Sequence, residues 1–179
     1  MRPLETVELF DVFLSDRDVG FSAVIVGGSA LALLGVVVRQ TRDVDVIYPI
    51  IPSSVIEAAR EFAAWRRSLG DELDGEWLNN GPASLVGSLP DGWKGRLVTV
   101  FEGRALTLRT LGRTDLLKTK LFALCDRGTD VRDCLALNPT TGELADAGSW
   151  VELQDGNPEW PRHVRETLRD LMARLGHGV

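Results

Sequence analysis

Two aspartates one residue apart, Asp43 and Asp45, are the side chains with the clearest chemical potential. They lie in the stretch DVDVIY, whose alternating valines predict a β-strand, and residues two apart in a strand share a face. Two carboxylates so close together repel each other unless a cation lies between them. Mg²⁺ prefers oxygen ligands and is typically held by one or two carboxylates together with phosphate oxygens. The pair therefore predicts a magnesium site for a nucleoside triphosphate.

A glycine turn precedes the acidic pair in the chain. Gly27 and Gly28 follow the apolar run SAVIV and lead into the apolar segment SALALL. A glycine turn at a helix start exposes backbone N–H groups and the positive end of the helix dipole, which suits a phosphate, and Ser29 adds a hydroxyl donor. Each feature alone is more often structural, a tight turn or a solvated strand edge. Their succession in this order favours a phosphate-binding site at Gly27, Gly28 and Ser29.

Two arginines lie between the glycine turn and the strand. Arg39 and Arg42 could bind the phosphates of the nucleotide, or they could form ordinary ion pairs with Asp43 or Asp45. The spacing leaves both interpretations open.

At this point the sequence resembles a known family. GGSAL, the pattern R-x-T-x-D-x-D, and later DLLKTKLFAL, an arginine and D-x-x-D are similar to motifs of the minimal nucleotidyltransferases of the DNA polymerase beta superfamily. The likeness is greatest to the bacterial branch that holds abortive-infection-type toxins of toxin-antitoxin pairs, and it extends over about residues 24–137.

The resemblance implies roles for individual residues. Gly28 and Ser29 would hold the nucleotide phosphates, Asp43 and Asp45 would bind one or two Mg²⁺ ions, and Lys120 would lie near the phosphates. It also implies that Asp130 and Asp133, which match a late acidic pair of the branch, help to position the acceptor. An RNA or protein acceptor and an antitoxin partner are further implications of the same resemblance.

The third metal-binding acid is the open point of this assignment. Two-metal sites usually need a third carboxylate, which the superfamily carries on a later strand, where this chain has Thr107 and Arg109. Glu102 and Asp115 are the alternatives. Without a third acid the chain would be a nucleotide-binding or regulatory module that lacks catalysis. A second rival is a structural partner protein in which the glycine pair is only a turn.

Structural interpretations compete for several other residues. Lys118 and Lys120 are two apart in a predicted helix and face different directions, so we predict that Lys118 is solvated, while Lys120 is either functional or solvated. Asp130, taken alone, favours a helix N-cap. The five tryptophans are widely scattered, which indicates core or interface anchors rather than base-stacking residues, namely Trp65, Trp77, Trp93, Trp150 and Trp160.

Periodicity predicts the elements that must position these residues. Strands are expected over residues 22–26 and 43–48 and in a hairpin of residues 96–101 and 105–111. Helices are expected over residues 4–16, 29–35 and 53–69, from about residue 114, near residues 130 and 140, and over residues 160–175. Ser29 and either Ser53 or Ser54 are placed to cap helices, and Thr140 with Glu143 forms a capping box.

Taken with the family resemblance, these elements predict an α/β or α+β nucleotidyltransferase fold, a small mixed sheet flanked by helices with a helical C-terminal part. The expected division is a nucleotidyltransferase core of residues 1–111 and a helical part of residues 112–179 packed on the core. The predicted function is Mg²⁺-dependent transfer of a nucleoside monophosphate from a nucleoside triphosphate to an acceptor hydroxyl of RNA, protein or a small molecule.

Composition excludes several function classes. The 179 residues carry a net charge of -6, which argues against broad, sequence-independent binding of nucleic acid. A local basic rim remains open, formed by Arg39, Arg42, Arg113, Lys120 and Arg127. Only two cysteines and two histidines are present, too few for a disulfide framework and without the spacing of a zinc site. We expect two buried thiols in a cytoplasmic protein without a targeting segment or a membrane span.

Overall fold

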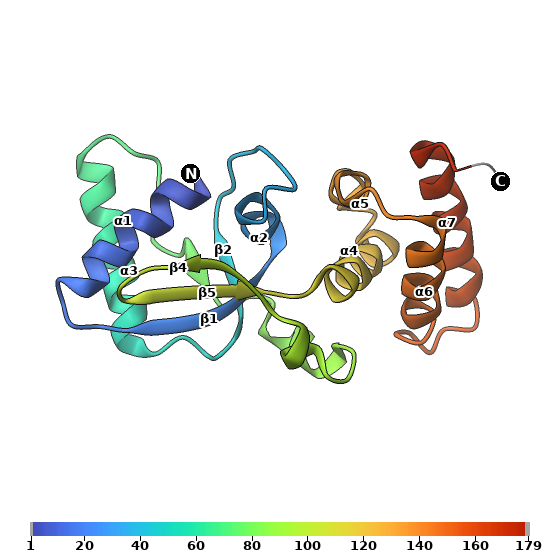
Figure 1. Cartoon of the computed structure of the whole chain (residues 1–179), viewed down its shortest axis with the longest axis horizontal. Coiled ribbons are helices and arrows are strands. Elements are labelled where there is room, and N and C mark those ends of the chain that lie inside the picture. Colours follow the sequence, from blue (N-terminus) through green and yellow to red (C-terminus); the bar gives the residue numbers. More distant parts are fainter. Residues whose placement is uncertain (1, 178–179) are drawn as a thin grey trace. The chain divides into compact units, whose positions relative to one another are not determined.

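Five strands form the sheet that carries the acidic pair. The computed structural model describes residues 2–177 and arranges the strands in the order β3-β2-β1-β5-β4 (Figure 1). Their bounds are β1 Phe21–Val26, β2 Val44–Tyr48, β3 Leu78–Asn79, β4 Val98–Glu102 and β5 Leu106–Thr110. Strand β1 is antiparallel to β2 and parallel to β5. The predicted small mixed sheet is therefore confirmed.

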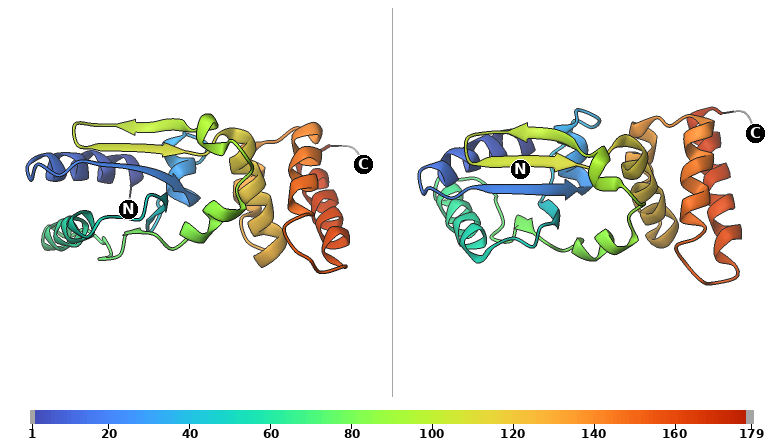
Figure 2. Two further views of the ribbon diagram at one scale, coloured as in Figure 1. Left: turned by 90° about the horizontal axis from the view of Figure 1, so that it is seen from below. Right: turned by 60° about the horizontal axis from the view of Figure 1, so that its bottom comes forward.

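Helices cover one face of this sheet. Their bounds are α1 Pro3–Ser15, α2 Gly27–Leu33 and α3 Ser53–Ser68. Alternate residues of β1 and β2, such as Ile25, Val44 and Val46, point toward α1 and α3 and belong to one buried apolar cluster with Phe10 and Phe62. Two further views show these helices beside the strands (Figure 2). The apolar side chains of the strands and helices thus meet in one core. The strand residues between them face the opposite side of the sheet.

A buried carboxylate attaches α1 to the hairpin of β4 and β5. Asp11 accepts hydrogen bonds from the backbone N–H groups of Arg104, Ala105 and Leu106 at 3.0, 2.8 and 2.7 Å. Burial raises the pKa of Asp11, but the three backbone donors lower it further, so that the pKa lies below its usual value. The carboxylate is therefore held ionised where the two elements meet.

The segment between α3 and the hairpin is less regular. It contains the two-residue strand β3 and two short 3-10 helices, η1 Ala83–Ser88 and η2 Trp93–Arg96. Residues 79–95 are rich in Gly, Pro, Asn and Ser, and turn residues of this kind carry no periodicity from which a single helical turn can be recognised in the sequence.

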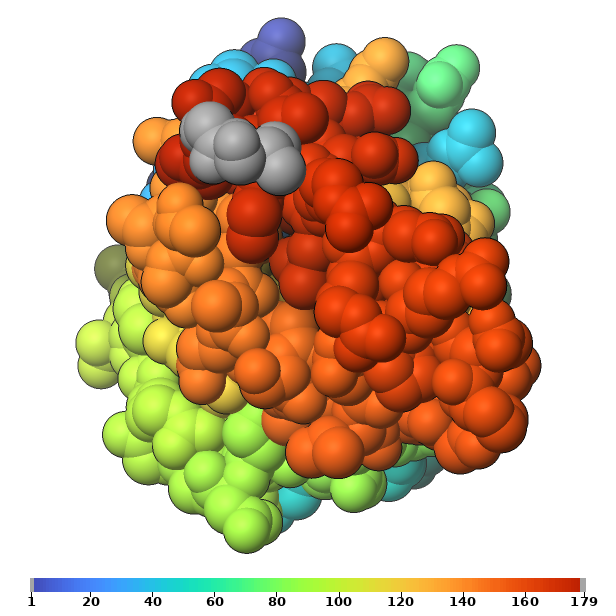
Figure 3. All heavy atoms as spheres, turned by 90° about the vertical axis from the view of Figure 1, so that its right-hand side faces the viewer, coloured from blue at the N-terminus to red at the C-terminus, as the bar shows by residue number. Residues whose placement is uncertain are grey.

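Four helices make up the C-terminal part of the chain. They are α4 Arg113–Arg127, α5 Val131–Leu137, α6 Thr141–Val151 and α7 Trp160–Leu175. Leu116, Leu121, Leu144 and Val164 are fully buried among them. The Thr140 and Glu143 capping box is confirmed at the start of α6. Figure 3 shows the outer surface of α6 and α7 in orange and red.

The chain divides into two compact units, one up to Leu111 and one from Gly112 onward. No helix between residues 2 and 177 combines the length and the apolar character that a bilayer crossing requires. Cys125 and Cys134 are free and buried in the second unit, and burial raises the pKa of their thiols to about 11 and about 12.

Three local predictions were wrong. Val26 is the N-cap of α2 and Pro52 that of α3, in both cases without a side-chain cap, so neither Ser29 nor Ser53 or Ser54 caps a helix. Glycine and proline set the backbone at these two starts without a capping side chain. Lys118 is not solvated, because its ammonium group lies 2.9 Å from Asp146 and its side chain is only 13% exposed.

Candidate nucleotide and metal site

The Asp45 carboxylate lies against the glycine turn. Asp45 on β2 pairs with Val26, the last residue of β1, and the turn begins at the next residue, Gly27. A Cβ atom built on Gly27 would lie 2.7 Å from Oδ2 of Asp45. Gly27 also has a φ of +78°, a left-handed conformation that side chains other than glycine rarely adopt. The backbone of the turn and the carboxylate are therefore immediate neighbours.

Strand register assigns this carboxylate to the face of the sheet opposite the core. Ile25 pairs with Val46, and both are buried in the core cluster. The next pair along, Val26 with Asp45, must point to the other face, because successive side chains alternate. Asp43 lies just before β2 and is exposed. The two aspartates thus straddle the start of β2, with Asp45 half-buried and Asp43 in solvent.

Gly28 brings the following loop close to the turn. A Cβ atom on Gly28 would lie 3.0 Å from Nη2 of Arg39 and 3.1 Å from Cγ2 of Thr41. The loop between α2 and β2 therefore folds back over the first turn of α2. Its Arg39 guanidinium group lies beside the backbone that was predicted to bind phosphate.

Ser29 holds this loop in place. It is buried at 1% exposure, its Oγ lies 2.8 Å from Oγ1 of Thr41, and it donates a hydrogen bond to the backbone carbonyl of Asp43. The serine therefore connects the start of α2 to the residue that directly precedes β2. Thr41 was not singled out as a site residue, although the threonine of the R-x-T-x-D-x-D pattern was the available signal.

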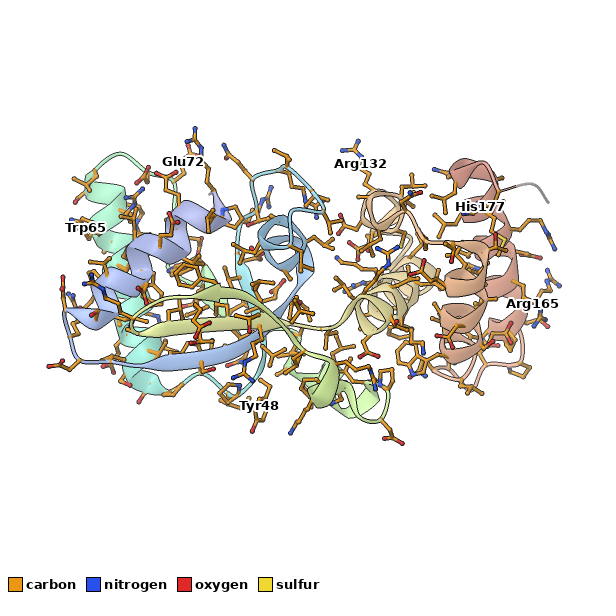
Figure 4. All side chains as sticks on the ribbon, in the orientation of Figure 1. Tyr48, Trp65, Glu72, Arg132, Arg165 and His177 are labelled. Carbon is orange, nitrogen blue, oxygen red and sulfur yellow. The ribbon has the colours of Figure 1, made fainter. Side chains whose placement is uncertain are left out.

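Asp43 borders an open cavity of about 680 Å³. Gln40, Thr41 and Arg42 line it on the same side, and an acidic stretch before β3 lines the rest, with Glu72, Asp74, Glu76, Trp77 and Asn79. The volume lies within the roughly 300–1,000 Å³ typical of sites for small-molecule ligands. Arg42 is exposed at the rim of this cavity. Glu72, one of the acidic residues that line this cavity, is labelled in Figure 4.

No third carboxylate joins the pair in a metal-binding group within the described part of the chain. Among residues 2–177 no three His, Cys, Asp or Glu side chains gather as a metal-binding group. Glu102 pairs with Thr107, which pairs with Ser22, so it lies four residues along β1 from Val26. At about 3.3 Å per residue this separation is about 13 Å, which excludes Glu102 from an ion held by Asp45. Asp115 lies buried in α4 of the second unit.

The remaining predicted residues meet in the second unit. The Lys120 ammonium group lies 2.7 Å from Oδ2 of Asp133 and 3.2 Å from Oδ1 of Asp130. Lys120 is on α4, Asp133 is on α5, and Asp130 is at the N-cap position of α5 without capping it. The Lys120 and Asp133 side chains are 9% and 1% exposed. Lys120 is thus not solvated, and the three form an ionic cluster between two helices in which Lys120 and Asp133 are buried and Asp130 is partly exposed.

The site residues therefore form two groups, each inside one unit. Gly27, Gly28, Ser29, Arg39, Arg42, Asp43 and Asp45 belong to the first unit, and Lys120, Asp130 and Asp133 belong to the second. In the first group the backbone donors of the turn, the Arg39 guanidinium group and the Asp45 carboxylate lie together, which is the combination of groups that a metal-bound triphosphate requires.

Comparison with known proteins agrees with this chemistry. No curated protein and no solved structure matches the chain. A family model described as "nucleotidyltransferase of unknown function (DUF6036)" matches residues 5–139. This range includes the glycine turn, Asp43 and Asp45, and the Lys120 cluster. With three quarters of its length matched, the chain belongs to this family of nucleotidyltransferases.

Proposed function

We propose that the protein transfers a nucleoside monophosphate from a nucleoside triphosphate to a hydroxyl group of an acceptor, with Mg²⁺ as cofactor. In this reaction the acceptor oxygen bonds to the α-phosphorus, and the bond from the α-phosphorus to the oxygen that bridges to the β-phosphorus breaks. Pyrophosphate leaves with that oxygen, and the hydroxyl proton passes to water. This chemistry is that of the DNA polymerase beta superfamily, whose motifs the sequence resembles.

The contact between Gly27 and Asp45 carries the proposal. The turn offers backbone N–H groups at the start of α2, and a carboxylate oxygen of Asp45 lies 2.7 Å from the position that a Cβ of Gly27 would take. A triphosphate bound at the turn would therefore meet the carboxylate directly. Arg39, beside Gly28, adds a positive charge on the same side. Gly27, Gly28, Ser29, Arg39 and Arg42 are the proposed nucleotide-binding residues, Ser29 through its backbone, because its hydroxyl group already donates to the carbonyl of Asp43.

The acidic pair fits a hard divalent cation. Asp43 and Asp45 supply two carboxylates on either side of the first residue of β2, and magnesium sites on nucleotides commonly use one or two carboxylates plus phosphate oxygens. Bound there, Mg²⁺ would neutralise the negative charge that develops on the phosphates. The chain's own part is to hold the triphosphate and to orient its α-phosphorus toward the acceptor.

One observation favours a second candidate function. Since no third acid joins the pair within residues 2–177, a module that binds the metal-nucleotide without transferring it is the alternative. The two candidates differ in a single property, because both bind nucleotide and only the first releases pyrophosphate.

Labelled nucleoside triphosphates with Mg²⁺ and a mixture of RNA, protein and small acceptors test the proposal on the full chain. We expect label to appear in an acceptor together with pyrophosphate, and to be lost in Asp45→Asn and Asp43→Asn. Asp16→Asn is the matched control, since Asp16 is exposed at the end of α1. Binding of Mn²⁺, followed by its paramagnetic resonance, should weaken in the same two variants.

The outcomes separate the candidates. Nucleotide binding that depends on Asp45, with no transfer under any condition, would establish the silent module instead. Transfer that persists in both aspartate variants would refute the proposed site.

The resemblance to toxin-antitoxin components supports a biological role for the transfer. Expression of the chain in a bacterial host should slow growth, and Asp45→Asn should relieve this effect. If the wild type and Asp45→Asn slow growth equally, or if neither slows it, the toxin role is wrong. A neutralising partner would be sought only after a positive result.

A further inference from the structure

A second pocket lies on the face of the sheet that carries Asp45. Val24 pairs with Tyr48 on β2 and with Arg109 on β5, so these three side chains share a face. The pair of Val26 with Asp45 lies two residues further along β1, about 7 Å at 3.3 Å per residue. Tyr48 and Arg109 line a cavity of about 190 Å³ together with Trp93 and Lys94.

This pocket is positively charged although the chain is acidic overall. Lys94 and Arg109 line it, and none of its lining residues is Asp or Glu. Within residues 2–177 neither cation has a carboxylate in ion-pair distance. Two exposed cations near each other without a counter-charge attract an anionic group.

Aromatic rings form the other part of the wall. The Lys94 ammonium group lies 4.6 Å from the centre of the Tyr48 ring and 5.6 Å from that of Trp93. Trp93 is buried, but Tyr48 is 48% exposed and projects from the end of β2 (Figure 4). An exposed ring beside cations is the combination by which proteins bind single-stranded nucleic acid, because bases stack on the ring and phosphates contact the cations.

The size of the pocket limits what it can hold. At about 190 Å³ it is smaller than the roughly 300 Å³ at which pockets begin to enclose a whole small-molecule ligand. It therefore suits one unit of a longer ligand, the rest of which stays on the surface.

We infer that this pocket binds one nucleotide of a single-stranded nucleic-acid acceptor. The base lies against the exposed side of Tyr48, and the phosphate lies between Lys94 and Arg109. A strand whose terminal hydroxyl lies at Asp45 would place its neighbouring nucleotide here. The identification of the strand as acceptor rests on the proposed function, whereas its binding at the pocket does not.

The inference is tested by the binding of fluorescein-labelled 12-nucleotide RNA and DNA strands to the full chain. Fluorescence anisotropy measures this binding over a series of salt concentrations. Lys94→Gln and Arg109→Gln should each lower the slope of log K against log salt by about 0.7 and the affinity by about 5-fold at 0.1 M salt. Tyr48→Leu should weaken binding about 5-fold or more, while Tyr48→Phe should bind as the wild type does.

Two controls guard against a merely structural effect. Arg67→Gln removes an exposed cation on α3 and should leave the affinity and the slope unchanged. Lys94→Arg keeps the charge and should bind strands as the wild type does. It serves as the comparison if Lys94→Gln proves less stable. Equal affinity in the wild type and in the double variant Lys94→Gln/Arg109→Gln, or no strand binding by the wild type, would overturn the inference.

The inference and the proposed function fail in distinguishable ways. Strand binding that depends on Lys94 and Arg109, without any transfer, would support the pocket and contradict the proposed function. Transfer that depends on Asp45 to a protein or small molecule, with strand binding indifferent to the pocket variants, would contradict the inference alone.

Discussion

Gly27 meets two requirements that no other residue type meets together at its position. Its φ of +78° is a conformation that L side chains rarely adopt, and a Cβ atom would lie 2.7 Å from the Asp45 carboxylate. Gly28 differs, because its neighbours are the side chains of Arg39 and Thr41, which belong to a loop. At the scale of single residues the site therefore depends on the first glycine more than on the second.

Gly27→Ala should destabilise the protein and displace the Asp45 carboxylate. The left-handed backbone alone costs an L residue about 1–2 kcal/mol, and the overlap with the carboxylate adds to this cost. Gly70→Ala is the matched control, since Gly70 has a φ of +95° with nothing within 4 Å of its Cβ position. Urea unfolding and Mn²⁺ binding measure the two effects.

We expect Gly70→Ala to lose stability only, and Gly27→Ala to lose stability and Mn²⁺ affinity. Equal Mn²⁺ affinity in the two variants would show that the carboxylate does not depend on the turn.

At the scale of elements, buried carboxylates connect helices to their neighbours. Asp11 is at the centre of α1 and accepts three backbone hydrogen bonds from the hairpin. The Gly103 backbone approaches so closely that a Cβ there would overlap the Asp11 carboxylate. Helical periodicity does not indicate this role, because an aspartate that accepts hydrogen bonds from distant backbone donors resembles any other polar helix residue in the sequence.

Asp11→Ala should lower the free energy of unfolding by about 2–3 kcal/mol, because it leaves one buried and two part-buried backbone N–H groups without their acceptor. The folded state lowers the pKa of Asp11 below the ordinary value of 3.8, so its contribution is complete above that pH and is lost as pH falls through the folded-state pKa. Urea unfolding from pH 7 downward measures both effects.

The wild type should therefore lose more stability in acid than Asp11→Ala does. Asp16→Asn is again the control and should follow the wild type. Parallel pH profiles for the wild type and Asp11→Ala would contradict the ionised, hydrogen-bonded state of this carboxylate.

The ionic cluster of Lys120 with Asp130 and Asp133 connects α4 to α5, as Asp11 connects α1 to the hairpin. Lys120→Met would deprive two carboxylates of their shared cation, and breaking a buried ion pair costs about 3–5 kcal/mol. Lys118→Met is the matched control, because its partner Asp146 is 59% exposed and its loss should cost about 1 kcal/mol or less.

Chemical denaturation measures this difference, and nucleotidyl transfer is followed in parallel. A large loss of stability in Lys120→Met supports a structural role. Unchanged stability with lost transfer would instead indicate that Lys120 acts on the substrate, as the family resemblance implies.

At the scale of the whole molecule, the family match crosses from the first unit into the second. Residues 5–139 include the complete sheet together with α4 and α5, while α6 and α7 follow it. The buried faces of α4, α6 and α7 nevertheless share one core, in which Leu121, Leu144 and Val164 are fully buried. The second unit therefore depends on helices from both sides of the match boundary.

Alkylation of the two thiols, Cys125 and Cys134, measures unfolding of the second unit within the full chain. Burial raises the pKa of Cys125 to about 11 and that of Cys134 to about 12, so both should resist alkylation at pH 8 in the native protein. Mass spectrometry should show labelling only as the second unit unfolds in urea. Rapid labelling of either thiol in native buffer would contradict its burial.

The sequence by itself determined the individual strands, most of the helices and the succession of a glycine turn and two acids along the chain. Those features follow from local rules, since strand alternation, helical periodicity and turn residues act over a few positions. Confirmed elements such as β2 and α7 needed no knowledge of distant contacts.

Only the tertiary structure decided which side chains meet. The strand register brings Asp45 to Gly27 and separates Glu102 from both, the loop after α2 returns to Ser29, and helix packing buries Lys120 between two carboxylates. It also places Lys94, from a segment without periodicity, beside Tyr48. Contacts of this kind join residues far apart in the chain, and their geometry depends on strand pairing and packing that no local pattern encodes.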